Sequence, residues 1–354
     1  MNLLVIGGGA IGCLVGAKLA VAGCQVTLVG RPAWAETVRQ QGLLLHEAGQ
    51  GVTVRTVQAI GSIADAFAQT AASYDLAILT VKSYDTAAAL AELRTVAVDR
   101  LPPFVSLQNG IGNEEALAAL LGAGRVIAGT ITTPVSVAGP GVIQIERPSH
   151  RVGLSPWVKG ENSSLVEQLA AALTHAGFQT KVYPDAAGMK WSKLLMNMMA
   201  NATCAILDEE PATVFADPAL VDLELAAWRE AFAVMRGDGI QPVNLGKYPF
   251  RWLAPLIRTL PNGLLRPLLR SQVAGARGGK LPSLHIDLNS GKGRSEVGWL
   301  NGAVAQKGAE IGVATPVNRL LTRTLLGLVE GSEARDRWRH NHSLLLGAVK
   351  NPIR

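Results

Sequence analysis

The sequence predicts an α/β protein in which a parallel sheet covered by helices is followed by an all-helical C-terminal part. Three observations support this prediction. Short apolar runs alternate with alanine-rich helical stretches in the first half of the chain, a glycine-rich turn follows the first run, and strand patterns become rare after Ala186. Strands that alternate with helices are typical of parallel sheets with both faces covered.

Five apolar runs in the first half have the length and boundaries of buried strands. They are residues 3–6, 26–29, 76–80, 104–107 and 126–130, with helical segments such as 86–98 and 114–121 between several of them.

Two later runs, 142–146 and 151–154, indicate further strands for which an antiparallel arrangement stays open. A helix over 163–175 and a strand over 180–182 would complete this part of the chain. The expected domains are therefore 1–184 for nucleotide binding and 185–354 for a helical substrate and catalytic part.

Composition excludes several classes of protein. The 354 residues are 48% hydrophobic and 17% charged, which suits one large domain or two ordinary ones and is unlike a disordered chain. Cys13, Cys24 and Cys204 form no CxxC pair, and the six histidines form no cluster with metal-ligand spacing. We therefore expect a reducing compartment and no metal site.

The first thirty residues are almost uncharged, with Lys18 the one charged side chain before Arg31. A signal peptide would need a basic start ahead of Leu3, and a membrane span would have to accommodate six glycines and Lys18. We expect a cytoplasmic protein that does not bind a membrane.

The net charge of +6 has two interpretations. A basic protein can bind nucleic acid, or it can attract a phosphorylated cofactor and an acidic substrate. The sequence carries no RNA- or DNA-binding signature, so the second interpretation is favoured and no nucleic-acid partner is expected.

A dinucleotide-binding motif directly follows the first predicted strand. It consists of Gly7, Gly8, Gly9, Ala10, Ile11 and Gly12, and it opens a helix that continues to Ala22. In G-x-G-x-x-G turns the first glycine allows the tight turn, the second admits a pyrophosphate, and the third lets helix and strand pack closely. The helix N-terminus then binds the anion through its N–H groups. This setting predicts a Rossmann-type cofactor site.

The residue after the second strand distinguishes between cofactors. NAD sites usually carry an acid there to hold the ribose 2′-OH, whereas this chain has Arg31 and no acid until Glu36. A guanidinium can bind a 2′-phosphate, so we predict NADP(H) rather than NAD. The alternative is that Arg31 is a solvated surface charge.

Two loops follow strands at the same expected sheet edge. Lys82 lies in the loop after the run at 76–80, and Asn109 lies in the loop after 104–107. Ligands of open parallel sheets gather at the carboxyl ends of the strands, so both side chains could reach cofactor or substrate. Asn109 with Gly110 is also an ordinary turn signal.

Lys193, Asn197 and Asn201 are spaced four apart, which predicts that they line one face of a helix. The rest of this helix is leucine, methionine, alanine and tryptophan and should be buried. Buried polar groups are costly without partners, and a ligand with a carboxylate, a carbonyl and a hydroxyl would supply them. The alternative, a face exposed to water, would carry more charge.

A lysine ammonium beside a ketone can protonate the developing alkoxide, a role typically worth about 10²–10⁴-fold in rate. It needs a counter-charge to remain protonated in a dry site. Glu296, at the head of a predicted helical run over 296–311, is the candidate.

Together these segments resemble the ketopantoate reductase family (2-dehydropantoate 2-reductases) over nearly the whole chain. The matching segments are GGGAIG at 7–12, Arg31, TVKSYD at 80–85, LQNGIG at 107–112, KWSKLLMNMMAN at 190–201, the block 283–302 with Glu296, and GVATPVN at 312–318.

The resemblance implies hydride transfer from NADPH to the ketone of 2-dehydropantoate, giving pantoate for pantothenate biosynthesis. It implies Lys193 as the general acid and Glu296 near the reacting hydroxyl and the cofactor. The 2-oxo acid would be held by Asn109, Asn197, Asn201 and Ser283. The implied partner is this small substrate, and a homodimer stays open.

The chain departs from the family pattern at three places. The family commonly has an asparagine–glycine pair about ten residues after the second helix asparagine, whereas this chain has acids and Pro211 over 208–211. The approach to Glu296 is one residue longer, and the proline- and arginine-rich stretch 242–280 is an expansion. We expect the stretch to form short helices packed on the domain, with a basic surface for a membrane or partner as the alternative.

Two other functions stay open. One is an NADPH-dependent reductase of a different 2-oxo acid or of an imine. The other is a non-catalytic regulatory protein that senses NADP, against which the lysine and asparagine spacing argues.

Overall fold

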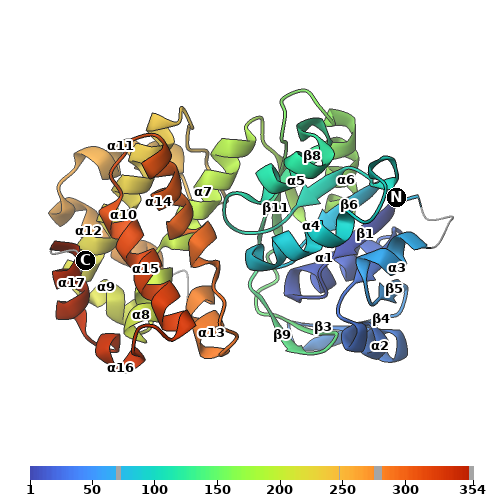
Figure 1. Cartoon of the computed structure of the whole chain (residues 1–354), viewed down its shortest axis with the longest axis horizontal. Coiled ribbons are helices and arrows are strands. Elements are labelled where there is room, and N and C mark those ends of the chain that lie inside the picture. Colours follow the sequence, from blue (N-terminus) through green and yellow to red (C-terminus); the bar gives the residue numbers. More distant parts are fainter. Residues whose placement is uncertain (69–72, 247, 275–280, 351–354) are drawn as a thin grey trace. The chain divides into compact units, whose positions relative to one another are not determined.

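The computed structural model describes residues 1–68, 73–246, 248–274 and 281–350 (Figure 1). The chain divides into two compact units. The first unit consists of Met1–Gln108 and Gly112–Lys190, and the second consists of Asn109–Ile111 and Trp191–Arg354. The short segment around Asn109 thus belongs to the helical unit, although its neighbours in sequence belong to the first.

The first unit contains an eight-stranded sheet in the order β12-β11-β8-β7-β6-β1-β2-β5. Its neighbouring strands are parallel except for β11 against β8. The strands are β1 (Asn2–Ile6), β2 (Gln25–Val29), β5 (Val57–Ile60), β6 (Leu76–Leu79), β7 (Phe104–Ser106), β8 (Val126–Thr132), β11 (Arg151–Pro156) and β12 (Gln179–Val182). The predicted α/β class is confirmed.

Two apolar clusters cover the two faces of this sheet. Leu3 and Val5 of β1 belong to one cluster, and Leu4 and Ile6 belong to the other, because successive side chains of a strand point to opposite faces. The helices of this unit are α1 (Ala10–Val21), α2 (Pro32–Gln41), α3 (Ile63–Ala68), α4 (Thr86–Leu93), α5 (Asn113–Leu121) and α6 (Ser163–His175). Burial on both faces explains why these strands are continuous apolar runs.

A second sheet of four strands, in the order β4-β3-β10-β9, was only partly predicted. Its strands are β3 (Leu43–Glu47), β4 (Gln50–Val54), β9 (Val135–Gly139) and β10 (Val142–Ile145). Glu47 lies within hydrogen-bond distance of His150 (2.8 Å) and Lys18 (3.4 Å), which ties β3 to α1. Burial raises the pKa of Glu47, but the hydrogen bond from His150 and the charge of Lys18 outweigh it, so this pKa lies below its usual value.

The second unit is helical throughout its described part, apart from one isolated bridge between Leu245 and Tyr248. Its helices are α7, which begins in the first unit (Ala186–Met198), α8 (Asn201–Leu207), α9 (Pro211–Ala216), α10 (Pro218–Gly237), α11 (Phe250–Thr259), α12 (Asn262–Ala274), α13 (Ser283–Asn289), α14 (Asn301–Glu310), α15 (Pro316–Glu330), α16 (Arg335–Trp338) and α17 (His342–Lys350). The long helix α10 packs against α9, α11, α12, α14, α15 and α17 (Figure 1).

The proline- and arginine-rich stretch forms α11 and α12, while its residues 247 and 275–280 lie outside the described part. Pro249 and Pro261 directly precede the two helices, as expected of helix breakers. Pro255 and Pro267 lie inside them, so these two prolines do not divide the stretch into shorter helices. Packing on α10 sustains both helices: Arg229 of α10 donates hydrogen bonds to carbonyls at their junction.

Among the described residues, no helix has both the length and the apolar character needed to cross a membrane.

Phe250 and Trp252 on α11 provide a matched test of the packing. Phe250 is fully buried and meets the Trp228 ring edge-on at a centroid distance of 5.9 Å, whereas Trp252 is 71% exposed. We expect Phe250→Ala to lower the free energy of unfolding by about 3–5 kcal/mol because it leaves a cavity. Trp252→Ala should change it by less than about 0.5 kcal/mol. Denaturant titration of both variants measures this, and equal losses would contradict the packing described here.

Candidate functional site

The glycine turn after β1 is held by close backbone contacts. Gly7 has a φ of +126°, and a Cβ there would lie 2.7 Å from the Thr80 hydroxyl oxygen. A Cβ at Gly12 would lie 1.9 Å from the Gly7 carbonyl oxygen. Both positions therefore require glycine, as the predicted roles in turning and packing demand.

Gly9 has the opposite surroundings. It is exposed, and a Cβ built on it would meet no described atom within 4 Å. It precedes the first residue of α1, where no described side chain caps the helix and no acid occupies the first turn. An open space at an uncapped helix N-terminus fits an anionic pyrophosphate.

Trp34 on α2 is a neighbour of this turn that the sequence analysis missed. A Cβ at Gly8 would lie 2.8 Å from its indole ring, and a Cβ at Gly30 would lie 2.1 Å from it. The indole thus packs directly on the backbone of the two loops that follow β1 and β2. The glycine before Arg31 was the available signal, because a bare backbone there lets an aromatic ring approach closely.

Arg31 occupies the N-cap position of α2 without a side-chain capping bond, and it is exposed after the carboxyl end of β2. The first turn of α2 contains no acid, so the helix N-terminus and the guanidinium both favour an anion at this place. Lys82 follows β6 and precedes the short 3₁₀ helix Ser83–Asp85, where it is half-buried. Arg31 and Lys82 therefore both follow the carboxyl ends of parallel strands, as the sequence predicted.

A buried network fixes the loops after β6 and β7. The Gln108 side-chain amide donates to the Val81 carbonyl (2.9 Å) and to the Thr86 hydroxyl (2.8 Å). The Lys190 ammonium donates to the Gln108 carbonyl (2.7 Å) and forms an ion pair with Glu114 (2.8 Å). Both ionised side chains are at most 2% exposed. Lys190 therefore holds the main chain of the residue directly before Asn109.

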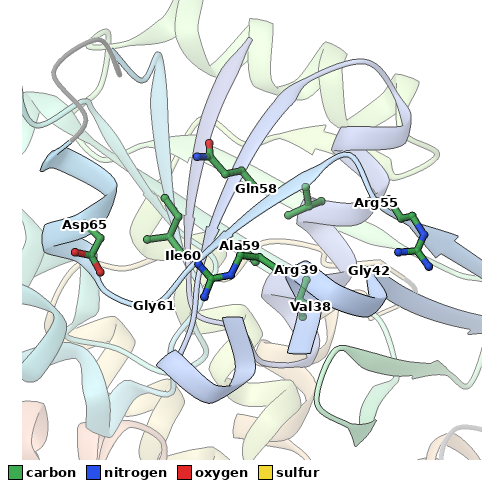
Figure 2. Close-up of a pocket in the computed structure, with 10 residues that line it drawn as sticks. Val38, Arg39, Gly42, Arg55, Gln58, Ala59, Ile60, Gly61 and Asp65 are labelled. Carbon is green, nitrogen blue, oxygen red and sulfur yellow. The ribbon is translucent and has the colours of Figure 1, made fainter. Parts of the chain in front are cut away.

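A cavity of about 360 Å³ lies elsewhere in the first unit, between α2 and β5 (Figure 2). In Figure 2, Asp65 lies toward one end of it and Arg55 toward the other. None of the residues predicted to bind cofactor or substrate lines this cavity, so it is separate from the predicted site.

In the second unit, the predicted polar face is divided between two helices. Lys193 and Asn197 lie on α7, which ends at Met198, and Asn201 is the first residue of α8. The prediction of one continuous helix was wrong here, because Ala200 adopts a left-handed conformation with a φ of +54°. Asn201 nevertheless stays next to Asn197, since its side-chain amide donates to the Asn197 carbonyl (2.9 Å).

The four predicted substrate-binding residues form one hydrogen-bonded chain. The Asn197 amide donates to the Asn109 side-chain oxygen (3.0 Å), and the Asn201 amide donates to the Ser283 hydroxyl (3.1 Å). The Asn201 side-chain oxygen accepts the Leu284 backbone N–H (2.9 Å), which fixes the start of α13. These hydrogen bonds bring together the polar side chains of residues that are far apart in the sequence.

Lys193 and Glu296 are both buried in the second unit, with exposed fractions of 7% and 4%. Glu296 begins a 3₁₀ helix (Glu296–Trp299), and α14 starts separately at Asn301, so the expected single helix over 296–311 was wrong. Leu300, with φ −104° and ψ −100°, separates the two. The bend in the backbone thus lies at Leu300, between the 3₁₀ helix that Glu296 begins and α14.

A hydrogen-bonded network of Asn301, Asn318 and Glu230 lies directly after this bend. The Asn301 amide donates to the Asn318 side-chain oxygen (3.0 Å), and the Asn318 amide donates to Glu230 (2.7 Å). Glu230 also accepts the backbone N–H groups of Val317 and Asn318 at the start of α15. Burial raises the pKa of Glu230 above its usual value despite these bonds.

The acids over 208–211 tie α8 to the C-terminal helices. Asp208 contacts His285 (2.7 Å), Arg335 (3.0 Å) and Arg339 (2.9 Å). Burial raises the pKa of Asp208, but the hydrogen bond from His285 and the nearby arginines outweigh it, and this pKa lies below its usual value. Pro211 begins α9. In this chain the segment 208–211 forms internal ion pairs, at the place where the family described above commonly has an asparagine.

Family models match both parts of the chain. The model of "Ketopantoate reductase PanE/ApbA" matches residues 3–158, and the model of its C-terminal domain matches residues 185–329. The chain belongs to the ketopantoate reductase family. It is therefore an oxidoreductase that acts on a CH–OH group.

Relatives of the same family cover nearly the full length. The chain is 31% identical over 328 residues to the 2-dehydropantoate 2-reductase of Pyrococcus horikoshii, covering 91% of this chain and 95% of the relative. It is 30% identical over 330 residues to that of Halobacterium salinarum, covering 91% and 96%.

Solved structures show the same fold. A ketopantoate reductase from Ralstonia eutropha is similar with a TM-score of 0.76 and 26% identity, covering 94% of this chain and 99% of that one. D-mandelate dehydrogenase with NADH and anilino(oxo)acetate has a TM-score of 0.78 at 21% identity, with the same coverage.

His342 provides a pH-dependent contribution to stability. It contacts Glu209 (2.9 Å) and Asp217 (2.8 Å). Burial lowers the pKa of His342, but these two acids outweigh it and raise this pKa above its usual value. Its stabilising contribution is therefore complete below the unfolded pKa of about 6.5 and is lost as the pH rises through the folded value.

We expect the stability of the wild type to fall as the pH rises above about 6.5, and His342→Gln to remove part of this fall. Denaturant midpoints across this range measure the difference. His175→Gln, on an exposed site of α6, serves as the control and should keep the wild-type slope. A slope in His342→Gln equal to that of the wild type would contradict the assignment.

Proposed function

We propose that the protein reduces the ketone of 2-dehydropantoate to pantoate with NADPH, a step of pantothenate biosynthesis. The observation that supports this most directly is the hydrogen-bonded chain of Asn109, Asn197, Asn201 and Ser283 in the same unit as buried Lys193. Such a set of amides and a hydroxyl suits a small acid with a carbonyl and a hydroxyl. The named activity of the relatives supports the same substrate.

Nucleotide binding is assigned to residues 1–184, and substrate binding and catalysis are assigned to 185–354 together with Asn109. The turn from Gly7 to Gly12 and the N-terminus of α1 would hold the pyrophosphate, because Gly9 offers open space there. Arg31 would bind the 2′-phosphate, and Lys82, Asn109 and Glu296 would make further contacts. When bound, the reduced nicotinamide supplies a hydride to the ketone carbon.

Lys193 acts as the general acid in this proposal. Its ammonium donates a proton to the carbonyl oxygen as negative charge develops there. Burial strengthens this interaction because few water molecules screen it. Glu296 supplies the counter-charge that keeps Lys193 protonated and lies near the hydroxyl that forms. Asn197 and Asn201 orient the substrate.

A second candidate is the reduction of another 2-oxo acid by the same residues. Asp208 is already engaged by one histidine and two arginines, and Pro211 offers no side-chain hydrogen-bond donor. This segment carries no asparagine, whereas the family commonly uses an asparagine there to bind substrate, and its Asp208 side chain is occupied by ion pairs. Steady-state NADPH oxidation with 2-dehydropantoate beside a panel of 2-oxo acids distinguishes the two candidates. Absence of turnover with every acid would overturn both and favour a sensor.

Lys193→Met should lower kcat with the preferred 2-oxo acid by about 10²–10⁴-fold, because it removes the proton donor. NADPH affinity, measured by fluorescence titration, should stay within about threefold of the wild type. Lys307→Met is the matched control, since Lys307 is a partly exposed lysine of α14 that pairs with Asp238 and Glu310. Undiminished turnover in Lys193→Met would remove Lys193 from the mechanism.

Arg31→Ala should weaken NADPH binding by about 10–100-fold and leave NADH binding nearly unchanged, because only NADPH carries the 2′-phosphate. Arg39→Ala, an exposed arginine on the same helix α2, is the control and should preserve the preference. Calorimetric titration of both nucleotides measures the ratio. Equal loss for NADPH and NADH would show that Arg31 does not select the cofactor.

A further inference from the structure

The break between α7 and α8 separates two residues of the proposed substrate site. Ala200, which lies between Asn197 and Asn201, is fully buried and has a φ of +54° and a ψ of 7°. Residues other than glycine rarely adopt this left-handed conformation because the Cβ approaches the following carbonyl. Such strain persists only where the surroundings enforce it, and it is frequent at functional sites.

Glu224 of α10 makes the contacts that enforce this conformation. One carboxylate oxygen accepts the Ala200 backbone N–H (2.8 Å), and the other accepts the Thr203 hydroxyl (2.5 Å). Glu224 is 4% exposed and Thr203 is fully buried. A carboxylate only accepts hydrogen bonds, so it can receive both donors at once and hold the two sides of the break together.

The break changes what the Asn201 side chain does. In a continuous helix, the Asn197 carbonyl would accept the backbone N–H of residue 201. Here it accepts the Asn201 side-chain amide (2.9 Å), and the side-chain oxygen of Asn201 accepts the Leu284 N–H (2.9 Å). The orientation of the Asn201 amide toward Ser283 therefore depends on the left-handed residue before it.

We propose that Glu224 is a positioning residue that sets the orientation of Asn201, and through it the affinity for the 2-oxo acid. This rests on the proposed function, in which Asn201 binds the substrate. Lys193 lies on α7 before the break, and the two contacts of Glu224 given above do not involve it. Glu224 accordingly acts on substrate binding and leaves proton donation largely unchanged.

Glu224→Gln replaces one acceptor oxygen by an NH₂ group that cannot receive a donor. KM for the 2-oxo acid that the wild type reduces should rise about tenfold or more, while kcat changes less than about threefold. Asp222→Asn is the matched control on the same helix, because Asp222 pairs with Arg266 and touches neither Ala200 nor Thr203 in the contacts described. A purely structural role would lower the amount of active protein and leave KM unchanged, which would overturn the proposal.

Glycine at position 200 provides a rescue experiment. Glycine adopts positive φ without the steric cost, so the double variant Glu224→Gln/Ala200→Gly should regain most of the wild-type KM. A double variant with the KM of Glu224→Gln alone would contradict the positioning role. Thr203→Val, which removes one of the two donors, should raise KM less than Glu224→Gln and serves if the latter does not fold.

A crystal structure of Glu224→Gln, or of Thr203→Val if the former does not fold, gives a readout independent of activity. We expect Ala200 to leave the left-handed region and the Asn201 amide to leave the Asn197 carbonyl. An unchanged break would overturn the proposal whatever the kinetics show. A wild type that reduces no 2-oxo acid would instead defeat the proposed function, and the structural comparison would still decide whether Glu224 sets the break.

Discussion

The hydrogen bond from the Asn197 amide to the Asn109 side chain is the contact on which the arrangement of the candidate site depends. Asn109–Ile111 follow β7 in sequence but belong to the helical unit. Besides the bond to Asn197, the Ile111 N–H donates to the Trp299 carbonyl. Buried amides must find partners, and here they find them in one another. Polar side chains on apolar helices are stable here because each one hydrogen-bonds its neighbour. Each amide also has further donor and acceptor sites that can bind a ligand.

Much of the first unit could be predicted because its strands are buried on both faces. Continuous apolar runs mark β1, β2, β6, β7 and β8, and the glycine turn lies where G-x-G-x-x-G predicts it. Strands β3, β4, β5 and β9 were missed because, as in exposed β4, polar residues or glycine interrupt their apolar residues. Their pairing depends on partners distant in sequence, which periodicity does not reveal.

The helical unit shows a different limit. The spacing of Lys193, Asn197 and Asn201 predicted one helix face, and the structure keeps Asn201 in contact with the Asn197 carbonyl. The break at Ala200 left no local signal, since alanine favours helix. The carboxylate that accepts the Ala200 N–H belongs to Glu224, on another helix. The roles assigned to these residues remain predictions.

Lys190 and Lys193 show why residue type and spacing do not settle a role. Both are buried lysines of α7. Lys190 is engaged by Glu114 and the Gln108 carbonyl and so fixes a loop. The partners of Lys190 come from parts of the chain that are distant in sequence, so no local pattern on α7 reveals them.

The indole of Trp34 has an evolutionary consequence. Because it packs on the bare backbone of Gly8 and Gly30, these three positions cannot change independently. A side chain at either glycine would displace the ring, whereas loss of the ring would release both glycines at once. Related sequences should therefore exchange the three as a set, so that this corner of the nucleotide-binding unit is inherited as one piece although its members are spread over the first thirty-four residues.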